Sequence, residues 1–224
     1  MTFSIVARCA ESGMFGVAVA SSSPAVAARC AYARAGVGAV ASQNVTDPAL
    51  GPRTLDLMGL GANAARAVAI IRDTAPHAEF RQLLAVDRNG GSAIHSGRRA
   101  LGVWAEARAN DVACGGNLLA DPGVPQAMVD AFAASKGPLG DRLIASMQAA
   151  LTAGGEAGPV RSAGLKMVRE VSWPVADLRV DWTEACPIAE LAALWALYKP
   201  QLEDYVARAL RPTAAPSFRV PGDL

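Results

Sequence analysis

Residues 1–8 of the chain read MTFSIVAR, and residues 15–20 read FGVAVA. Both stretches are rich in residues that favour β-strands, and the intervening stretch 9–13, CAESG, is polar and typical of a turn. We therefore predict a β-hairpin that begins at the very N-terminus. Residues 3–8 are expected to form a central strand, which would hold the start of the chain rigidly.

The rest of the chain groups strands together and helices together, which is typical of a layered α+β sandwich and not of alternating βαβ units. The pair Asn89-Gly90 predicts a hairpin turn in which both positions have positive φ. We predict two stacked, mainly antiparallel sheets between helical layers. The further strands are expected at 36–43, 82–87, 92–96, 111–113, 163–171 and 177–182, and the helices at 54–74, 125–135, 138–152 and 187–210.

Composition limits the class of partner. The 224 residues are 52% hydrophobic and 18% charged, with a net charge of +1 and 5% aromatic residues. This balance is globular, and it gives neither the basic patch nor the aromatic platform of a nucleic-acid-binding protein. We expect a small-molecule substrate or a second copy of the chain as the partner. Residues 1–210 are predicted to form one domain, and the proline-rich stretch 211–224 an extended tail.

The short apolar run at 13–20, followed by small residues, is similar to a secretory signal. Against that alternative, Glu11 precedes the run, Gly13 and Gly16 dilute it, and its alternation suits a buried strand. No run reaches transmembrane length, and the four cysteines lack C-x-x-C spacing. We expect a cytoplasmic protein with reduced thiols and no membrane partner.

Motifs for several kinds of chemistry are missing from the sequence. His77 and His95 are the only histidines, so a three-histidine metal site is excluded, and no H-E-x-x-H, P-loop or G-x-S-x-G motif occurs. The glycine pair at 36 and 38 lacks the third glycine of a dinucleotide-binding loop. We expect neither a metal nor a cofactor.

Thr2 offers a nucleophile that needs no histidine. Initiator methionine is removed when the next residue is small, which would leave Thr2 with a free α-amine of pKa about 7.7–8.0 beside its own hydroxyl. That amine can accept the hydroxyl proton, so one residue supplies nucleophile and base. The alternative is that Met-Thr is an ordinary start without meaning.

Short stretches along the chain, taken in order, resemble a bacterial family catalogued as a domain of unknown function, DUF1028. The resemblance covers nearly everything from Met1 to about Leu202. It implies an N-terminal-nucleophile hydrolase fold, which is a four-layered αββα sandwich. The stretches are 1–8, 16–21, 35–43, 81–82, 95–97, 116–119, 142–143, 162–163 and 177–181.

The resemblance also implies roles for particular residues. Thr2 becomes the nucleophile and, through its amine, the base. Ser21 orients the nucleophile, and Gln43 donates to the amine or hydroxyl. Asn117 and the amide of Gly116 form an oxyanion hole, which needs preorganised donors. The alternative for these polar residues is an ordinary hydrogen bond at a strand end or turn.

Charged and polar residues elsewhere are candidates for substrate binding. Arg81 and Arg179 suit a substrate carboxylate, although each also suits a structural ion pair. His95 and Asp181, which lie in stretches that carry the resemblance, complete the substrate-binding candidates.

Two departures from the family pattern bear on the substrate. Trp182 and Thr183 stand where the family has a second aspartate and a histidine, and residues 158–161 replace a Gly-Asp-Arg-Arg-Gly loop and a glutamine before Ser162. We expect an amidohydrolase that opens a small polar amide, ureide or cyclic imide through an acyl-enzyme on Thr2. The alternative is a catalytically silent protein that binds a metabolite or serves in assembly.

Overall fold

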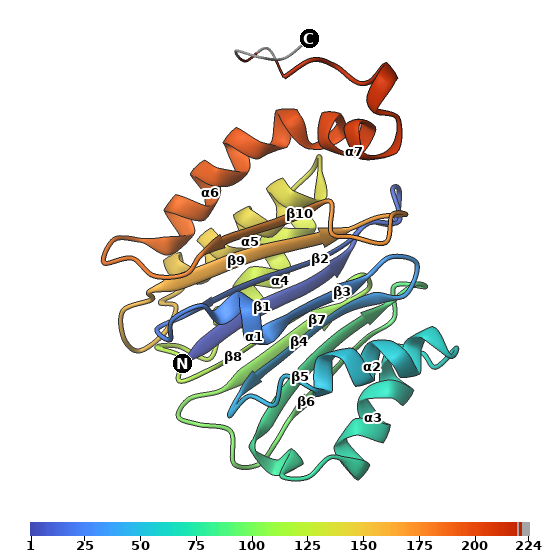
Figure 1. The fold of residues 1–224 in the computed structure, drawn as a ribbon. Helices are drawn as coiled ribbons and strands as arrows, with labels where there is room; N and C mark the ends of the chain where they lie inside the picture. Colours follow the sequence, from blue (N-terminus) through green and yellow to red (C-terminus); the bar gives the residue numbers. More distant parts are fainter. Residues whose placement is uncertain (219, 221–224) are drawn as a thin grey trace.

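The computed structural model describes residues 1–218 and 220. The predicted N-terminal hairpin is present, and it lies at the centre of the larger of two sheets (Figure 1). The strands are β1 (Thr2–Arg8), β2 (Phe15–Ser21), β3 (Ala31–Arg34), β4 (Gly38–Asn44), β5 (Arg81–Asp87), β6 (Ser92–Ser96), β7 (Ala105–Ala109), β8 (Val112–Asn117), β9 (Ser162–Val168) and β10 (Ala176–Val180).

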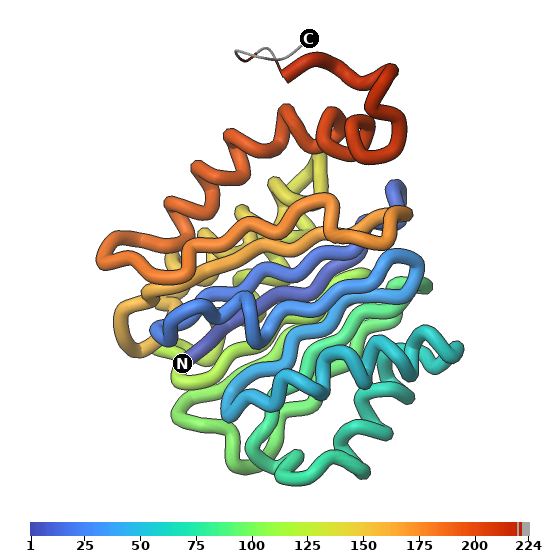
Figure 2. Tube along the Cα trace, in the orientation of Figure 1, coloured from blue at the N-terminus to red at the C-terminus, as the bar shows by residue number. Residues whose placement is uncertain are grey.

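Both sheets are antiparallel throughout. Six strands pair in the order β10-β9-β2-β1-β8-β7, and four pair in the order β3-β4-β5-β6. Figure 2 shows the consequence for the N-terminal hairpin, which is flanked by β8 from the middle of the chain and by β9 from its last third. The first strand is therefore held on both sides by hydrogen-bonded neighbours, and its start is fixed where termini usually fray.

Helices cover the outer face of each sheet, which confirms the four-layered α+β sandwich (Figure 1). The helices are α1 (Val26–Cys30), α2 (Leu50–Gly59), α3 (Ala64–Thr74), α4 (Val124–Ala134), α5 (Leu139–Thr152), α6 (Pro187–Tyr198) and α7 (Leu202–Leu210), with 3-10 turns η1 (Ala78–Phe80), η2 (Lys199–Gln201) and η3 (Pro212–Ala214). α2 and α3 pack on the smaller sheet. α4 and α5 pack on the larger one, and α6 contacts α5 and the strands β9 and β10.

The alternation of β1 divides its side chains between two cores. Phe3 and Ile5 pack toward the helices α4 and α5, whereas Val6 packs between the two sheets. Thr2 and Ser4 share the face of Val6, because successive strand residues point to opposite sides. The first strand therefore directs its two hydroxyls into the space between the sheets.

Two predicted helices are broken in the structure. The helix expected at 54–74 is two helices, because Gly61 adopts φ +104 and the chain turns between α2 and α3. The helix expected at 187–210 is interrupted by a 3-10 turn that contains Pro200, whose ring cannot continue the α-helical hydrogen bonding.

The sequence prediction also missed short elements and misjudged one turn. It gave no account of α1, β3 and β7, which are short or carry little apolar alternation. In the turn between β5 and β6 only Gly90 has positive φ, whereas Asn89 does not. The Asp87 carboxylate accepts the amides of Asn89 and Gly91 and holds that turn.

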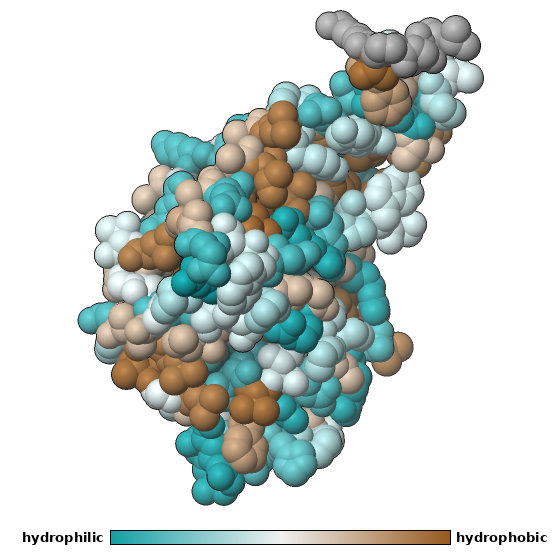
Figure 3. Space-filling model, turned by 60° about the vertical axis from the view of Figure 1, so that its left-hand side comes forward, coloured by the Kyte–Doolittle hydropathy of each residue, from teal (hydrophilic) through white to brown (hydrophobic). Residues whose placement is uncertain are grey.

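Part of the predicted tail 211–224 lies outside the described residues, namely 219 and 221–224. Within the described part, Arg208 stacks on Phe218 at 3.7 Å and donates to the carbonyl of Pro216. No helix in the described ranges has the length and apolar character to cross a membrane. Figure 3 shows that the exposed hydrophobic residues of one face lie in separate patches between hydrophilic ones. Association with a second copy of the chain stays a prediction.

Candidate functional site

Thr2 lies in a row of polar residues that crosses the larger sheet at one end. In the strand register it stands opposite Asn117 of β8, and the Phe3–Ala20 pairing places Ser21 of β2 on its other side. The Thr2 and Ser21 hydroxyls are 3.2 Å apart and buried. Side chains directly opposite in an antiparallel sheet have Cβ atoms about 4.5–5.5 Å apart, so Asn117 is a direct neighbour of Thr2.

The carbonyl of Met1 lies against both hydroxyls. Thr2 Oγ1 and Ser21 Oγ each donate a hydrogen bond to it. The space beside the Thr2 hydroxyl therefore accommodates a planar carbonyl group whose oxygen faces protein donors.

A buried amide network from the smaller sheet faces this row. Gln43 Nε2 donates to Gln82 Oε1 at 2.7 Å and to the Gly115 carbonyl at 3.1 Å, while its Oε1 accepts from Ser4 at 2.7 Å. Asn117 Nδ2 reaches the same Gln82 Oε1 at 3.4 Å. The network is neutral and almost fully hydrogen-bonded, which fixes the Asn117 amide toward the space between the sheets.

Gln82 is a site residue that the sequence analysis missed. It is fully buried, and its Nε2 also donates to Ser96 at 2.9 Å and to the Gly116 carbonyl at 3.2 Å. A glutamine at the first inward position of a strand that otherwise reads Leu-Leu-Ala-Val was the available signal.

Glu156 is a second residue that the sequence analysis missed. Only 5% of it is exposed, and its Oε2 accepts the backbone amide of Ser22 at 3.1 Å. Burial raises the pKa of this carboxyl to about 7, against the opposing effect of the N-terminal amine and of the hydrogen bonds from Ser22. A carboxylate therefore lies near the start of β1.

The structure brings together Thr2, Ser21, Gln43 and Asn117, with Gly116 adjacent to them. Gly116 pairs with Phe3, and a Cβ added at this position would lie 2.6 Å from Leu119 Cδ2, so a larger residue would have to displace the Leu119 side chain. These roles in catalysis stay predictions.

The remaining candidates for substrate binding lie elsewhere. His95 projects from the helix-covered face of β6, where its Nε2 lies 2.9 Å from the Ala78 carbonyl. Arg81 precedes Gln82 and donates to the Val45 carbonyl. Asp181 is exposed beyond β10, and Arg179 is paired with Asp177 at 2.9 Å. None of these four side chains has a contact with Thr2 among the described residues, but the strand register places Asp181 at the same end of the larger sheet, two strands beyond Ser21.

The two departures from the family pattern meet each other in space. Arg161 pairs with Glu184 at 2.7 Å and lies 6.0 Å from the ring of Trp182, and its carbonyl accepts the amide of Thr183. Arg161, Glu184 and Glu156 line one cavity of about 430 Å³. The altered loop and the altered strand end therefore belong to a single surface next to the start of β1.

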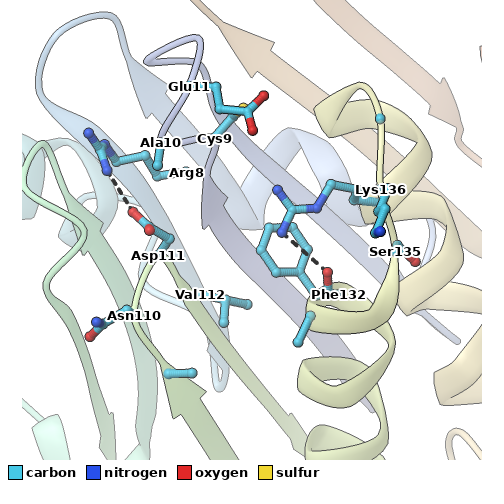
Figure 4. Close-up of a pocket in the computed structure, with 14 residues that line it drawn as sticks. Arg8, Cys9, Ala10, Glu11, Asn110, Asp111, Val112, Phe132, Ser135 and Lys136 are labelled. Atoms are coloured by element: carbon cyan, nitrogen blue, oxygen red, sulfur yellow. Dashed lines mark hydrogen bonds and ion pairs between the residues drawn. The ribbon is translucent and has the colours of Figure 1, made fainter.

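A different cavity, of about 470 Å³, lies at the opposite end of β1 (Figure 4). Arg8 and Asp111 form an ion pair of 2.8 Å on its wall, and Arg142 stacks on Phe132 at 3.8 Å. Burial raises the pKa of the Cys9 thiol, but hydrogen bonds with Ser12 and the backbone, together with Arg142, outweigh it and lower that pKa. None of the predicted site residues lines this cavity.

No group of histidine, cysteine, aspartate or glutamate side chains within 1–218 and 220 is arranged to hold a metal ion. The candidate site around Thr2 is composed instead of hydroxyls, amides and one carboxylate.

The fold and the site together define a class of protein: a four-layered α+β sandwich with buried hydroxyl groups at the start of a central strand. The sequence model of a protein family, described as "Family of unknown function (DUF1028)", matches residues 2–191. The chain belongs to this family.

A solved structure from the same family agrees with that assignment. A crystal structure of a DUF1028 protein from Silicibacter pomeroyi is similar at 29% identity and a TM-score of 0.82, over 88% of this chain and 89% of that chain. Anbu, an ancestral β-subunit from Yersinia bercovieri, matches at 11% identity and a TM-score of 0.38, over 91% of this chain and 97% of that chain. No curated protein matches the sequence.

Proposed function

We propose that this protein is an amidohydrolase of the N-terminal-nucleophile type, acting on a small polar amide, ureide or cyclic imide. The observation that carries the proposal is the Met1 carbonyl, which accepts hydrogen bonds from Thr2 and Ser21. After Met1 is removed, a substrate carbonyl would take the same place against the Thr2 hydroxyl.

The reaction would run in two halves on Thr2. Its Oγ1 attacks the substrate carbonyl carbon while the hydroxyl proton moves to the α-amine of the same residue. The developing oxyanion is stabilised by the Asn117 amide, which lies opposite Thr2. The C–N bond then breaks as the leaving nitrogen takes the proton from the ammonium, and water hydrolyses the resulting ester.

The decisive variant is Thr2→Ala in the Met1-free protein. It should keep the fold, since Ala fits the strand, and lower hydrolysis by roughly 10⁴- to 10⁶-fold. Thr2→Ser should retain part of the activity. The measurement is turnover of the best substrate from a screen of amides, ureides and cyclic imides, with the intact mass establishing that Met1 is gone.

Cys9→Ala, at the other end of β1, serves as the control and should hydrolyse like the wild-type protein. An active Thr2→Ala protein would overturn the proposal. A purified chain that retains Met1, and hydrolyses nothing in the screen, would favour the alternative of a silent protein that binds a metabolite.

A further inference from the structure

The loop that carries Glu156, residues 153–161 between α5 and β9, lies against the start of β1. It is tied to both neighbours of that strand: the amide of Ser22, just after β2, donates to the Glu156 carboxylate, and Leu119, just after β8, forms a β-bridge with Glu156. Gly158 of the same loop packs against the Met1 side chain, where an added Cβ would lie 2.9 Å from Met1 Cε. The loop therefore crosses the end of the sheet where the chain begins.

The Glu156 carboxylate is buried, and only one of its two oxygens accepts a hydrogen bond among the described residues. Its Oε1 has no hydrogen-bond partner within residues 1–218 and 220, and water has little access to it because only 5% of Glu156 is exposed. A buried carboxylate oxygen without a donor is costly, so such an atom calls for a partner. The positive charge of the N-terminal amine lowers the pKa of Glu156, whereas burial raises it by more.

Other charges near the loop are already paired. Among the described residues that line the cavity beside Glu156, the only cation is Arg161, and Glu184 holds it at 2.7 Å. Asp121, which lies near Gly154 of the loop, accepts the Gly123 amide at 2.6 Å. The α-amine is left as the natural cation for Glu156.

We propose that Glu156 is a positioning residue, which accepts a hydrogen bond from the α-amine of Thr2 once Met1 has been removed. The inference rests on the proposed function of Thr2. Removal of Met1 moves the amine by one residue, about 3.3 Å along the strand, to the Thr2 nitrogen. One N–H then faces the carboxylate, which leaves the lone pair free to take the proton of the Thr2 hydroxyl.

The test is the titration of that amine, because it requires no substrate. A neighbouring carboxylate favours the ammonium form and so raises the pKa of the amine. Glu156→Gln keeps the shape and removes the charge, so the midpoint should fall by about one pH unit. The measurement is the rate of N-terminal acetylation by acetic anhydride between about pH 5 and pH 9, followed by mass spectrometry of the N-terminal peptide.

Glu184→Gln is the matched control, since it removes a carboxylate from the same cavity wall that is paired with Arg161. It should leave the midpoint unchanged, and Glu156→Asp should restore part of the shift. In the Thr2→Ala protein, which keeps the α-amine but lacks the hydroxyl, Glu156→Gln should lower the midpoint of the amine by the same amount.

The two proposals can therefore fail separately. An unchanged midpoint in Glu156→Gln overturns the role of Glu156 whatever Thr2 does. A shifted midpoint combined with full hydrolysis by Thr2→Ala retains the Glu156–amine contact and removes the proposed nucleophile. If Met1 resists removal even by added methionine aminopeptidase, the role of Glu156 is wrong.

Discussion

The two ends of strand β1 carry opposite kinds of chemistry. At the Thr2 end the groups are buried and mostly neutral: two hydroxyls, a glutamine–asparagine network and one carboxylate with a raised pKa. At the Arg8 end, the groups are charged and partly exposed, around an ion pair whose side chains are 20% and 26% exposed.

The two ends of β1 differ in the environment of their polar groups and not in the size of their cavities. The Arg8 end has a cavity of about 470 Å³ and the Thr2 end one of about 430 Å³, but the charges at the Arg8 end are close to solvent and weakened by it. The Thr2 end has donors that are buried and already oriented by hydrogen bonds, and such donors stabilise a developing charge without reorganisation. The chemistry is therefore expected at the Thr2 end.

The largest expected difference between the two ends concerns Asn117. Asn117→Ala removes the oxyanion donor opposite Thr2 and should lower kcat by about 10²- to 10³-fold, or about 3–4 kcal/mol, with a much smaller effect on KM. Steady-state kinetics with the substrate from the screen measures both constants.

The matched control is Asn110→Ala, which removes an exposed asparagine from the cavity at the Arg8 end. It should leave both constants unchanged. A rise in KM with kcat preserved in Asn117→Ala would assign Asn117 to ground-state binding and deprive Thr2 of this oxyanion partner.

A smaller effect is expected from the buried network. Gln82→Leu removes the acceptor shared by Gln43 and Asn117 and leaves those donors buried without it. The free energy of unfolding should fall by about 1–3 kcal/mol, as measured by urea denaturation. A midpoint of denaturation equal to that of the wild-type protein would show that the network is not held in the folded protein.

The architecture followed from local pattern, whereas the site depended on register. The strand-forming stretches at 1–8 and 15–20 predicted β1 and β2, because alternation and β-branched residues act locally. The prediction of a single helix at 54–74 was wrong because helical spacing does not show that Gly61 adopts positive φ and that the first helix ends before it.

Asn117 could be proposed from the sequence only through the family resemblance. Its position opposite Thr2 arises from pairing between residues far apart in the chain, which propensity does not encode. Glu156 was missed for a related reason. It stands among small residues in a Gly-Gly-Glu-Ala-Gly loop, and such a loop reads as solvent-exposed until β2 and β8 bury it.

The smallest effect is expected at the Arg8 end, from Asp111→Asn. Asp111 has φ +65, a conformation that asparagine also adopts, so the substitution removes the charge without straining the backbone. The backbone bonds of Asp111, from Arg8 N to its carbonyl and from its amide to Gly90, stay in place. A partly exposed ion pair contributes about 0–1 kcal/mol, and salt screens it. Urea denaturation at low salt and at about 1 M salt should therefore show a small loss of stability that shrinks in salt, with hydrolysis unaffected. A loss above about 2 kcal/mol, or a fall in kcat, would mean that the charged end of β1 supports the Thr2 end, and the contrast between the two ends would have to be abandoned.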